Sequence, residues 1–315
     1  MGRGSATLRG WLLGLCMGCR AESSPAVAES VTPGVGSPAR LIAMGDVHGD
    51  LDAAIDALMA AGVVDEEGRW VGGSVRVVQV GDQLDRGNQE RALLAWFDRL
   101  TEEAEAAGGS FRPLIGNHET MNVALDPRYV TPGGFADYAD LASELSEPLR
   151  STIRPDAQGR VAAFRPGGVE ALRLAAHPVI AIDSGMLFAH GGVLPVHLEE
   201  GIDAINREVS DWMRGDRPDA PSISGPDSPV WTRAYSQDPD DGDCEDARRV
   251  LDTLGLERMI VAHTVQEEGI ASACGGRVWR VDVGLSRHYG GPIQVLEFGS
   301  GDPTVRAGSR RKSAW

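Results

Sequence analysis

Three short polar segments, each preceded by an apolar run, constrain the fold of this chain more than any other feature. The segments are Gly45-Asp46-Val47-His48-Gly49-Asp50, Gly81-Asp82-Gln83-Leu84-Asp85-Arg86-Gly87 and Gly116-Asn117-His118-Glu119. The runs before them, at 41–44, 75–80 and 111–115, have the composition of buried strands, so each segment is predicted to be a loop at the carboxyl end of a strand. Ligands bind outside such strand ends in open α/β sheets. The aspartates, histidines, asparagine and arginine of these loops suit metal ions with a phosphate above them.

The stretches that follow the first two loops have the periodicity of helices. Apolar residues recur from Leu51 to Met59 and stop before Gly62, and the pattern at 92–100 is of the same kind. A strand, a loop, a helix and a second strand in this order predict a βαβ unit with parallel strands. Further strands are expected at 179–182, 186–189, 258–262, 277–283 and 293–298, with a hairpin turn at 183–185 and a helix at 245–254.

Length and charge narrow the class of protein. A chain of 315 residues is long enough for one α/β domain with a large buried core. Its formal charge is −16 and its pI is about 4.8. Neutralising the phosphates of a nucleic acid or of an anionic membrane requires a basic surface, which this composition lacks. We therefore expect no nucleic-acid partner, and we expect local metal charge to attract a phosphate substrate.

Residues 1–19 have the character of an export signal. Arg3 and Arg9 precede a short apolar run that ends at Cys19 and is followed by polar residues. The run is too short to remain as a membrane span. Met17-Gly18-Cys19 also resembles the end of a bacterial lipoprotein signal, where cleavage leaves Cys19 as the lipidated first residue. We expect an exported protein, periplasmic or held at a membrane through Cys19, and the alternative is a cytosolic leader.

The rest of the chain is predicted to form one domain at 40–306. Serines, prolines and glycines at 20–39 predict a flexible tether, and the basic tail at 307–315 is expected to be frayed. The pattern loosens at about 120–176, which indicates an insertion beside the active site that acts as a lid or binds substrate. Outside the leader the chain has two cysteines, Cys244 and Cys274. They form either a disulfide or two free thiols, and export favours the disulfide.

The three loops resemble, in order, the Gly-Asp-x-His-Gly, Gly-Asp-x-x-Asp-Arg-Gly and Gly-Asn-His-Glu motifs of the calcineurin-like metallophosphoesterases. The complete Asp-Arg-Gly and His-Glu forms are those of the phosphoprotein-phosphatase branch. Phe188-Ala189-His190-Gly191-Gly192 and Val261-Ala262-His263-Thr264 match further motifs, so the resemblance spans roughly 40–290. It implies a four-layer α/β/β/α sandwich with an insertion near the active site. The Ser-Ala-Pro-Asn-Tyr-Cys segment of the eukaryotic enzymes is replaced by 282–286, which looks more like the Shewanella-like phosphatases.

The resemblance implies a site for two divalent metal ions. Carried over residue by residue, it gives the first ion Asp46, His48 and Asp82, and gives the second Asp82 as a bridge with Asn117, His190 and His263. Such mixed nitrogen and oxygen ligands suit manganese, iron or zinc. For a lone histidine at the end of an apolar run, the alternative is a hydrogen-bonded core residue.

The resemblance also assigns catalytic roles. His118 looks like the general acid that protonates the leaving group, with Asp85 holding its other ring nitrogen. Arg86 resembles the phosphate-binding arginine of the family, and we expect Arg233 to be a second one. We expect Glu119 to brace the backbone. We expect structural or surface roles for the other histidines, His177, His197 and His288. His288 and Tyr289 are expected near the mouth of the site.

The expected function is the hydrolysis of phosphomonoesters by direct attack of a metal-bound hydroxide, without a covalent phosphoenzyme. A phosphorylated protein is the first expectation for the substrate, and a small phosphoester is the second. A dinucleoside-polyphosphate hydrolase on the same fold is one alternative. A non-catalytic metal-binding interaction domain is another, and His118, Asp85 and Arg86 speak against it because metal binding does not require them.

Overall fold

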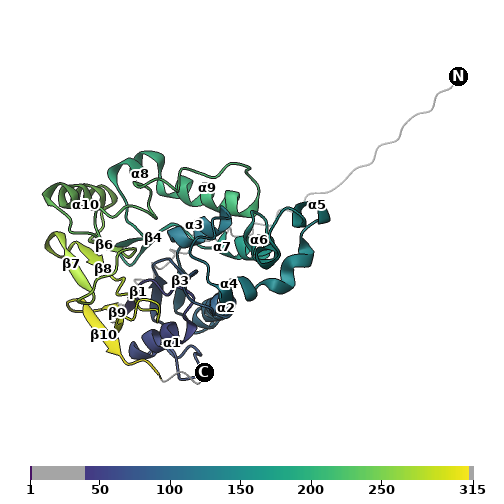
Figure 1. Cartoon of the computed structure of the whole chain (residues 1–315). Coiled ribbons are helices and arrows are strands. Elements are labelled where there is room, and N and C mark those ends of the chain that lie inside the picture. Colours follow the sequence, from purple (N-terminus) through teal and green to yellow (C-terminus); the bar gives the residue numbers. More distant parts are fainter. Residues whose placement is uncertain (2–39, 312–315) are drawn as a thin grey trace. The chain divides into compact units, whose positions relative to one another are not determined.

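The computed structural model describes Met1 and residues 40–311 of the chain (Figure 1). The predicted signal at 1–19 and the tether at 20–39 lie outside the described residues, apart from Met1. Among the helices that the structure does describe, none combines the length and the apolar character needed to cross a bilayer.

The first sheet has the strand order β10-β9-β1-β2-β3 and carries the three motif loops. The predicted strands are present as β1 (Leu41–Met44), β2 (Arg76–Gln79) and β3 (Ser110–Pro113), and they pair in parallel. Parallel pairing requires crossover connections, which are the predicted helices α1 (Leu51–Ala60) and α2 (Glu90–Ala106). The other two strands, β9 (Ile293–Phe298) and β10 (Thr304–Gly308), are antiparallel to their neighbours.

The second sheet has the strand order β4-β5-β6-β8-β7. Its strands are β4 (Ile180–Asp183), β5 (Met186–Ala189), β6 (Arg258–Val261), β7 (Ala271–Ala273) and β8 (Val278–Arg280). The hairpin expected at 183–185 joins β4 to β5, and Ser184 and Gly185 adopt positive φ values of 49° and 75°. A two-residue turn with both residues in this region matches the twist of an antiparallel pair.

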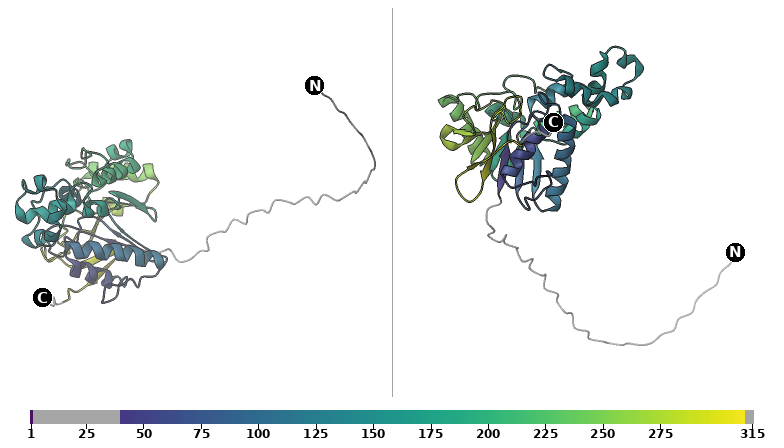
Figure 2. Two further views of the ribbon diagram at one scale, coloured as in Figure 1. Left: turned by 90° about the vertical axis from the view of Figure 1, so that its right-hand side faces the viewer. Right: turned by 60° about the horizontal axis from the view of Figure 1, so that its bottom comes forward.

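The two sheets pack face to face between two layers of helices (Figures 1 and 2). Successive side chains of a strand point to opposite faces, and the buried clusters follow this rule. Leu41 and Ala43 pack with Phe188 and Ile260 between the sheets, whereas Ile42 and Met44 pack with α1 and α2. On the far face of the second sheet lie α8 (Pro195–Glu200), α9 (Ile202–Arg214) and α10 (Asp241–Leu254). The predicted four-layer α/β/β/α sandwich is therefore confirmed.

The insertion expected at about 120–176 consists of short helices. These are α3 (Asn117–Val123), which begins in the third motif, α4 (Pro132–Ala136), η1 (Ala139–Glu144), α5 (Glu147–Arg150), η2 (Pro155–Ala157), α6 (Gln158–Phe164) and α7 (Val169–Leu174). They surround the buried rings of Tyr138 and Phe164, whose centroids are 5.1 Å apart. Each helix is too short to show a clear apolar period, which is why the sequence pattern appeared loose.

Two strands, β7 and β10, were not predicted from the sequence, and the C-terminal segment is ordered beyond residue 307. Every residue of β10 is exposed, so the strand has no apolar signal, and only its pairing with β9 defines it. The prediction of a frayed tail from residue 307 is wrong as far as Arg311, whose amide donates to Asp56 Oδ2 of α1 at 2.8 Å. Residues 312–315 lie outside the described part of the chain.

The two cysteines outside the leader form a disulfide. Cys244 lies in α10, and Cys274 follows β7 at the start of the short helix η3 (Cys274–Gly276). Their Cα atoms are 5.0 Å apart, and the bond closes a loop with a sequence separation of 30. Of the two alternatives left open by the sequence, the structure has the disulfide, and the bond joins α10 to the edge of the second sheet.

Candidate metal centre and active site

Both sheets contribute loops to one buried cluster of polar residues. Asp46 and His48 follow β1, Asp82 follows β2, and Asn117 follows β3. His190 follows β5 and His263 follows β6, so the second sheet delivers its histidines to the same place. All six predicted ligands are at most 8% exposed. The structure therefore brings together every residue that the sequence predicted to bind metal.

The backbone of the cluster is strained. Among the described residues, nine that are not glycine have positive φ, and five of them are predicted site residues: His48, Asp82, Asp85, Arg86 and His263. Such a conformation costs about 1–3 kcal/mol for each residue and persists only where the surroundings enforce it. This concentration of strain marks the loops as a functional site.

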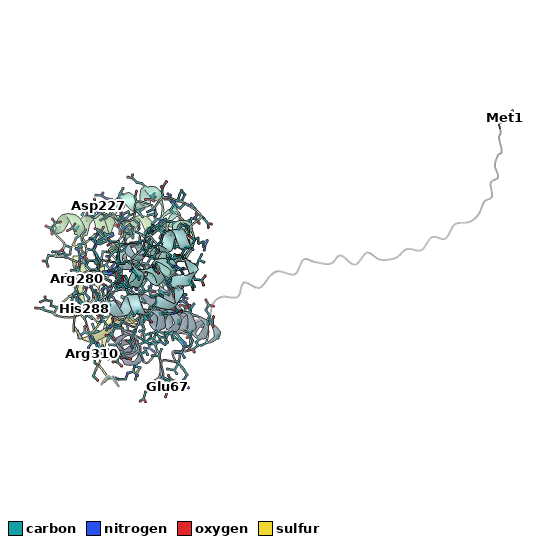
Figure 3. The ribbon with its side chains drawn as sticks, turned by 45° about the vertical axis from the view of Figure 1, so that its right-hand side comes forward. Met1, Glu67, Asp227, Arg280, His288 and Arg310 are labelled. Carbon is teal, nitrogen blue, oxygen red and sulfur yellow. A yellow bond between two sulfur atoms is a disulfide. The ribbon has the colours of Figure 1, made fainter. Side chains whose placement is uncertain are left out.

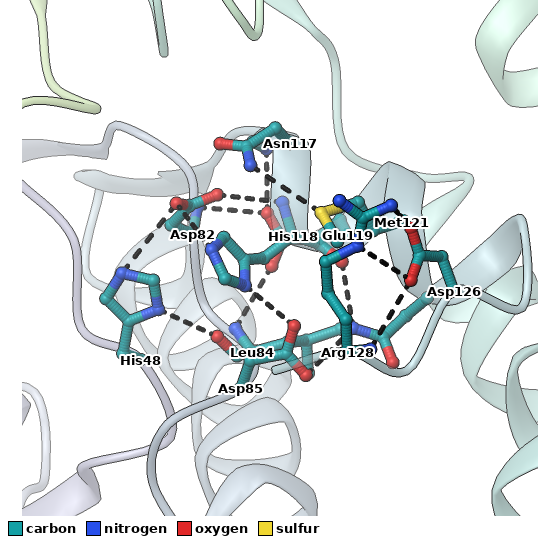
Figure 4. A network of polar contacts seen from close by, with 12 residues as sticks. His48, Asp82, Leu84, Asp85, Asn117, His118, Glu119, Met121, Asp126 and Arg128 are labelled. Carbon is teal, nitrogen blue, oxygen red and sulfur yellow. Dashed lines mark hydrogen bonds and ion pairs between the residues drawn. The ribbon is translucent and has the colours of Figure 1, made fainter. Parts of the chain in front are cut away.

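The first group of possible metal ligands is arranged around His48. Its Nδ1 donates to the carbonyl oxygen of Leu84 at 2.9 Å, which leaves the lone pair on Nε2 (Figure 4). That Nε2 lies 3.8 Å from Asp46 Oδ2 and 3.7 Å from Asp82 Oδ2. These distances are too long for hydrogen bonds but leave room for an ion between the atoms. Burial and the nearby His118 lower the pKa of His48 to about 4, so the ring is in the neutral form that a metal requires.

The second group is arranged around His190. Its Nδ1 donates to the carbonyl oxygen of Val80 at 2.8 Å, so its Nε2 is also free to coordinate. This Nε2 lies 3.0 Å from Asn117 Oδ1, 3.1 Å from His263 Nδ1 and 3.2 Å from Asp82 Oδ2. Four atoms that accept hydrogen bonds thus converge on one point. Burial opposes protonation of His190, but the charge of Asp82 raises its pKa, which places a proton where a cation would otherwise lie.

Two further observations test whether the cluster fits cations. Asp46 Oδ1 is buried and has no hydrogen-bond partner among the described residues. Burial and the carboxylates of Asp282 and Asp82 raise the pKa of Asp46 well above its ordinary value. A buried polar atom without a partner is destabilising, and so are crowded buried carboxylates. Divalent cations would relieve both. Two clusters of side chains could hold a metal ion, His48 with Asp82 and His118, and Asp82 with His190 and His263. Asp82 belongs to both, as a bridging residue must. The residues present therefore fit two metal ions.

Asp282 belongs to the cluster but was not predicted as a site residue. It follows β8, is 2% exposed, and accepts a hydrogen bond from the amide of Gly284 at 2.9 Å. The loop can approach the first motif because position 45 is a glycine, where a Cβ would lie 2.3 Å from the carbonyl oxygen of Val281. Burial raises the pKa of Asp282 to about 6. The sequence prediction placed it inside a strand at 277–283, whereas β8 ends at Arg280 and leaves Asp282 in the loop that follows.

His118 and Asp85 form a hydrogen-bonded pair beside the predicted metal ligands (Figure 4). His118 Nδ1 lies 2.7 Å from Asp85 Oδ2, and its Nε2 faces Asp82 Oδ2 at 3.8 Å. Burial opposes its protonation, but the charge of Asp82 and the hydrogen bond to Asp85 outweigh burial and raise the pKa of His118 to about 9. The imidazole is therefore oriented, and it holds a proton at neutral pH.

Glu119 fixes the loop that carries Asp82. Its carboxylate accepts hydrogen bonds from the amides of Asp82 at 2.9 Å, Gln83 at 2.8 Å, Leu84 at 3.1 Å and Gly116 at 2.7 Å. With these contacts the carboxylate links the second and third motifs through their backbones. This is the bracing expected from the sequence.

The two predicted phosphate-binding arginines occupy different environments. The guanidinium of Arg86 stacks on the ring of Tyr129, 3.9 Å from its centroid, and its Nε has no hydrogen-bond partner among the described residues. Arg233 Nη1 donates to the carbonyl oxygen of His263 at 2.8 Å and to Thr264 Oγ1 at 2.6 Å. Arg86 is thus positioned by stacking and retains free donors, whereas Arg233 is tied to the loop of a predicted metal ligand.

A pocket of about 570 Å³ opens beside the cluster and is lined by His48, Arg86, Asn88, Arg287 and His288, among others. Arg310 Nη2 donates to the carbonyl oxygen of Gly291 at 2.9 Å, so the C-terminal segment holds the loop that carries His288 (Figure 3).

Two tyrosines flank this entrance. The ring centroid of Tyr129 is 5.0 Å from that of His118, and the centroid of Tyr289 is 5.3 Å from that of His48. Tyr289 was expected near the mouth of the site. Tyr129 was not predicted, because it lies in the insertion, where the sequence pattern is loose.

The remaining histidines lie where structural roles explain them. His197 Nδ1 accepts from the amide of Leu194 and caps α8, at a distance of 2.9 Å. His177 contacts the second motif through Gln83, whose Nε2 lies 3.3 Å from His177 Nδ1. Neither ring belongs to the ligand groups, in agreement with the prediction.

Comparisons with known proteins agree with this geometry. A family model described as calcineurin-like phosphoesterase matches residues 39–267. Shewanella-like protein phosphatase 2 of Arabidopsis thaliana is 38% identical over 294 residues, which cover 83% of this chain and 75% of that protein.

Solved structures share the fold. The cold-active protein-tyrosine phosphatase of a psychrophilic Shewanella species has a TM-score of 0.64 at 22% identity, with 86% of this chain and 81% of that chain covered. A protein serine/threonine phosphatase from Saccharomyces cerevisiae has a TM-score of 0.56 at 16% identity, with 88% and 82% covered. Five motifs in order, a four-layer sandwich and one shared cluster of ligands have a single common explanation. The chain belongs to the calcineurin-like phosphoesterase family, whose members use divalent metal ions to hydrolyse phosphoesters.

Proposed function

We propose that this chain is a phosphomonoesterase with two divalent metal ions and that its physiological substrate is a phosphorylated protein. The observation that carries the proposal is that His118 Nε2 lies 3.8 Å from Asp82 Oδ2 while Asp85 holds its Nδ1. Asp82 is the residue common to the two possible metal-binding clusters, which are His48, Asp82 and His118, and Asp82, His190 and His263. A site that only stored metal would require neither the hydrogen bond between His118 and Asp85 nor a free guanidinium at Arg86.

In this proposal the first ion is held by Asp46, His48 and Asp82. The second is held by Asp82 together with Asn117, His190 and His263, and the nitrogen and oxygen donors suit manganese, iron or zinc. When bound, two such ions lower the pKa of a water molecule and neutralise the phosphoryl oxygens. Asp282 lies against Asp46 and helps to fix the orientation of its carboxylate.

The other residues position the substrate and move one proton. Arg86 presents unpaired donors in the pocket, and a planar guanidinium matches two phosphoryl oxygens. Arg233 contributes a second positive charge next to His263. His118 donates the proton on Nε2 to the leaving oxygen, and Asp85 keeps Nδ1 protonated and the ring oriented. No side chain is required to form a covalent phosphoenzyme.

The kind of substrate rests on the relatives and on the shape of the site. Shewanella-like protein phosphatase 2 of Arabidopsis thaliana is named as a protein phosphatase and is 38% identical to this chain. The pocket beside Arg86 has room for residues that flank a phosphorylated side chain. A phosphoprotein therefore remains the leading substrate, and a dinucleoside polyphosphate and a purely metal-binding role are the competing possibilities.

A substrate panel with metal analysis tests the proposal. The purified protein would be loaded with manganese, iron or zinc, its metal content measured, and its turnover compared on a phosphoserine peptide, a phosphotyrosine peptide and diadenosine tetraphosphate. Two ions per chain and faster turnover of a phosphopeptide are expected. Preference for the dinucleotide would replace the proposed substrate class, and two bound ions without any turnover would support the interaction domain.

We also propose that the protein is exported. The disulfide between Cys244 and Cys274 supports this, because disulfides persist in oxidising compartments. Cleavage of the chain after residue 18 that is sensitive to globomycin would indicate a lipid anchor on Cys19. An intact leader on the mature protein would refute export by this route.

A further inference from the structure

Arg160 is a buried cation for which the mechanism above has no role. It lies in α6 of the insertion, and its side chain is 4% exposed. The residue before it is Gly159, where a Cβ would lie 1.9 Å from the carbonyl oxygen of Tyr138. This close approach lets α6 pack tightly against the segment that carries Tyr138. The guanidinium of Arg160 lies over the ring of Phe164, 4.7 Å from its centroid. Arg160 is thus directed inward by packing.

Every nitrogen of the Arg160 guanidinium has a partner. Nη2 donates to Asp85 Oδ1 at 3.2 Å, and Nη1 binds the carboxylate of Glu90. Nη1 also donates to the carbonyl oxygen of Gly134 at 3.0 Å, and Nε donates to Asn122 Oδ1 at 2.9 Å. These partners come from the loop after β2, from the first turn of α2, from α4 and from α3. One side chain of the insertion therefore ties together four separate segments.

The contacts fix the carboxylate of Asp85 from the side opposite His118. Its Oδ2 faces His118 Nδ1 at 2.7 Å, whereas its Oδ1 accepts from Arg160 and from Asn122 Nδ2, the latter at 3.1 Å. Asn122 Nδ2 also donates to the carbonyl oxygen of His118 at 2.9 Å. Rotation of the Asp85 carboxylate is thus restrained by bonds to both oxygens, and the direction of the His118 ring follows from it.

The charge of Arg160 also holds Asp85 in place, because it neutralises two buried carboxylates. Asp85 and Glu90 are fully buried, and Arg160 is the guanidinium that contacts both. Without it, two buried carboxylates would face each other through the amide of Asp85, which donates to Glu90 Oε1 at 2.6 Å. Buried charges without a partner rearrange or admit water. A lysine could supply the charge but not the fork of donors that reaches Asp85, Glu90 and Asn122 together.

We propose that Arg160 is a positioning residue for the phosphatase reaction, holding Asp85 so that His118 Nε2 points at the leaving oxygen. The inference rests on the proposed function and extends it. It gives the insertion a part in the proton-donating machinery, and the lid or substrate-binding role expected from the sequence stays a prediction. Arg160 touches neither the substrate nor a predicted metal ligand, and it acts only through Asp85 and His118.

Leaving-group dependence tests this role. A poor leaving group such as phenolate needs the proton from His118, whereas 2,4-dinitrophenolate leaves without it. In Arg160→Met, turnover of phenyl phosphate should fall about tenfold more than turnover of 2,4-dinitrophenyl phosphate, a part of the factor expected for general acid catalysis. Bound metal should be unchanged. In a His118→Asn background the same substitution should have little further effect, because the group through which it acts is gone.

A spectroscopic measurement separates positioning from general destabilisation. The proton that His118 Nδ1 shares with Asp85 should give a downfield proton NMR signal, assigned by its loss in His118→Asn. In Arg160→Met this signal should shift or broaden, and Arg160→Lys should restore it only in part. Arg154→Ala, which removes an exposed arginine of the same insertion, is the matched control and should change neither the signal nor the leaving-group ratio.

The outcomes are distinguishable. Equal losses on both phenyl esters, additive losses in the double variant or an unmoved NMR signal would each overturn the role of Arg160 while leaving the phosphatase proposal intact. If Arg160→Met does not fold, Arg160→Met with Glu90→Gln removes one stranded charge and keeps an acceptor for the amide of Asp85. A metal-loaded wild-type protein without turnover on any phosphoester would refute the proposed function, and the inference with it.

Discussion

His118 Nδ1 lies 2.7 Å from Asp85 Oδ2, and this hydrogen bond determines which ring nitrogen can face the predicted metal ligands. With Nδ1 engaged, Nε2 is directed toward Asp82 Oδ2. The same logic holds for His48 and His190, whose Nδ1 atoms donate to backbone carbonyl oxygens at 2.9 Å and 2.8 Å. In all three histidines a fixed Nδ1 therefore leaves Nε2 for chemistry, and such supporting contacts tune reactivity as much as the ligands do.

His118→Asn should remove proton donation while leaving the metal site intact. Turnover of esters with poor leaving groups is expected to fall by about 10²- to 10⁴-fold, because that is the usual contribution of a general acid. Esters with good leaving groups should be affected much less. Steady-state kinetics with metal analysis of each variant measures this, and unchanged turnover of phenyl phosphate would refute the acid role.

Asp82→Asn should abolish binding of the metal pair. Asp82 belongs to both ligand groups, and an amide offers one neutral oxygen where the carboxylate offers two charged ones. Metal content by mass spectrometry should fall from two ions per chain to one or none. Asp65→Asn, at a half-buried loop position that pairs with Arg69, is the control. A variant of Asp82 that still holds two ions would show that the bridge is misassigned.

The pH dependence should follow the protonation of His118. Its pKa is raised from 6.5 to about 9 in the cation-free protein. Bound cations offset the charge of Asp82, so the working value should lie below about 9. Because the proposed role requires the protonated form, turnover of phenyl phosphate should decline as the pH rises through this pKa. The decline should be absent for 2,4-dinitrophenyl phosphate, and a pH profile common to both substrates would contradict the assignment.

Metal removal should destabilise the protein more at high pH than at low pH. Burial raises the pKa of Asp282 from 3.8 to about 6, and that of Asp46 also rises. The folded cation-free protein therefore holds protons that the unfolded chain releases, and its stability falls as the pH rises through about 6. The drop in Tm caused by a chelator should accordingly be larger at pH 8 than at pH 5.

Asp282→Asn provides the control for this pH effect. The substitution removes one of the crowded carboxylates, so it should reduce the pH dependence of the cation-free protein. A chelator effect on Tm that is independent of pH in the wild-type protein would be incompatible with carboxylate crowding.

Removal of the disulfide should lower stability without affecting the site. The bond between Cys244 and Cys274 has a sequence separation of 30 and joins α10 to the edge of the second sheet. Closing a loop of this length restricts the unfolded chain, so Cys244→Ser with Cys274→Ser should lower the free energy of unfolding by about 3 kcal/mol. Denaturant titration measures the change, and metal content is the internal control. An unchanged midpoint would show that the bond contributes nothing to global stability.

Much of the site could be predicted from local sequence. A turn that follows a buried strand is recognisable from composition, so the positions of Asp46, Asp82 and Asn117 on neighbouring strands followed from the pattern before each of them. Family resemblance added His190 and His263, which composition alone would have left as core histidines. Asp282 was not predicted because the expected strand at 277–283 included it, and only the early end of β8 at Arg280 places it in a loop.

Local sequence was enough to predict the parallel strands, the loops at their ends and the aspartates and histidines of those loops. These features depend on periodicity and on the order of residues, which are local properties. Contacts between distant segments could be read only from the folded chain. Two sheets bring His190, His263 and Asp282 to the same point, exposed β10 pairs with β9, and Arg160 reaches Asp85 from the insertion. Such contacts join residues far apart in the chain, and their energies come from burial and charge pairing that no single segment contains.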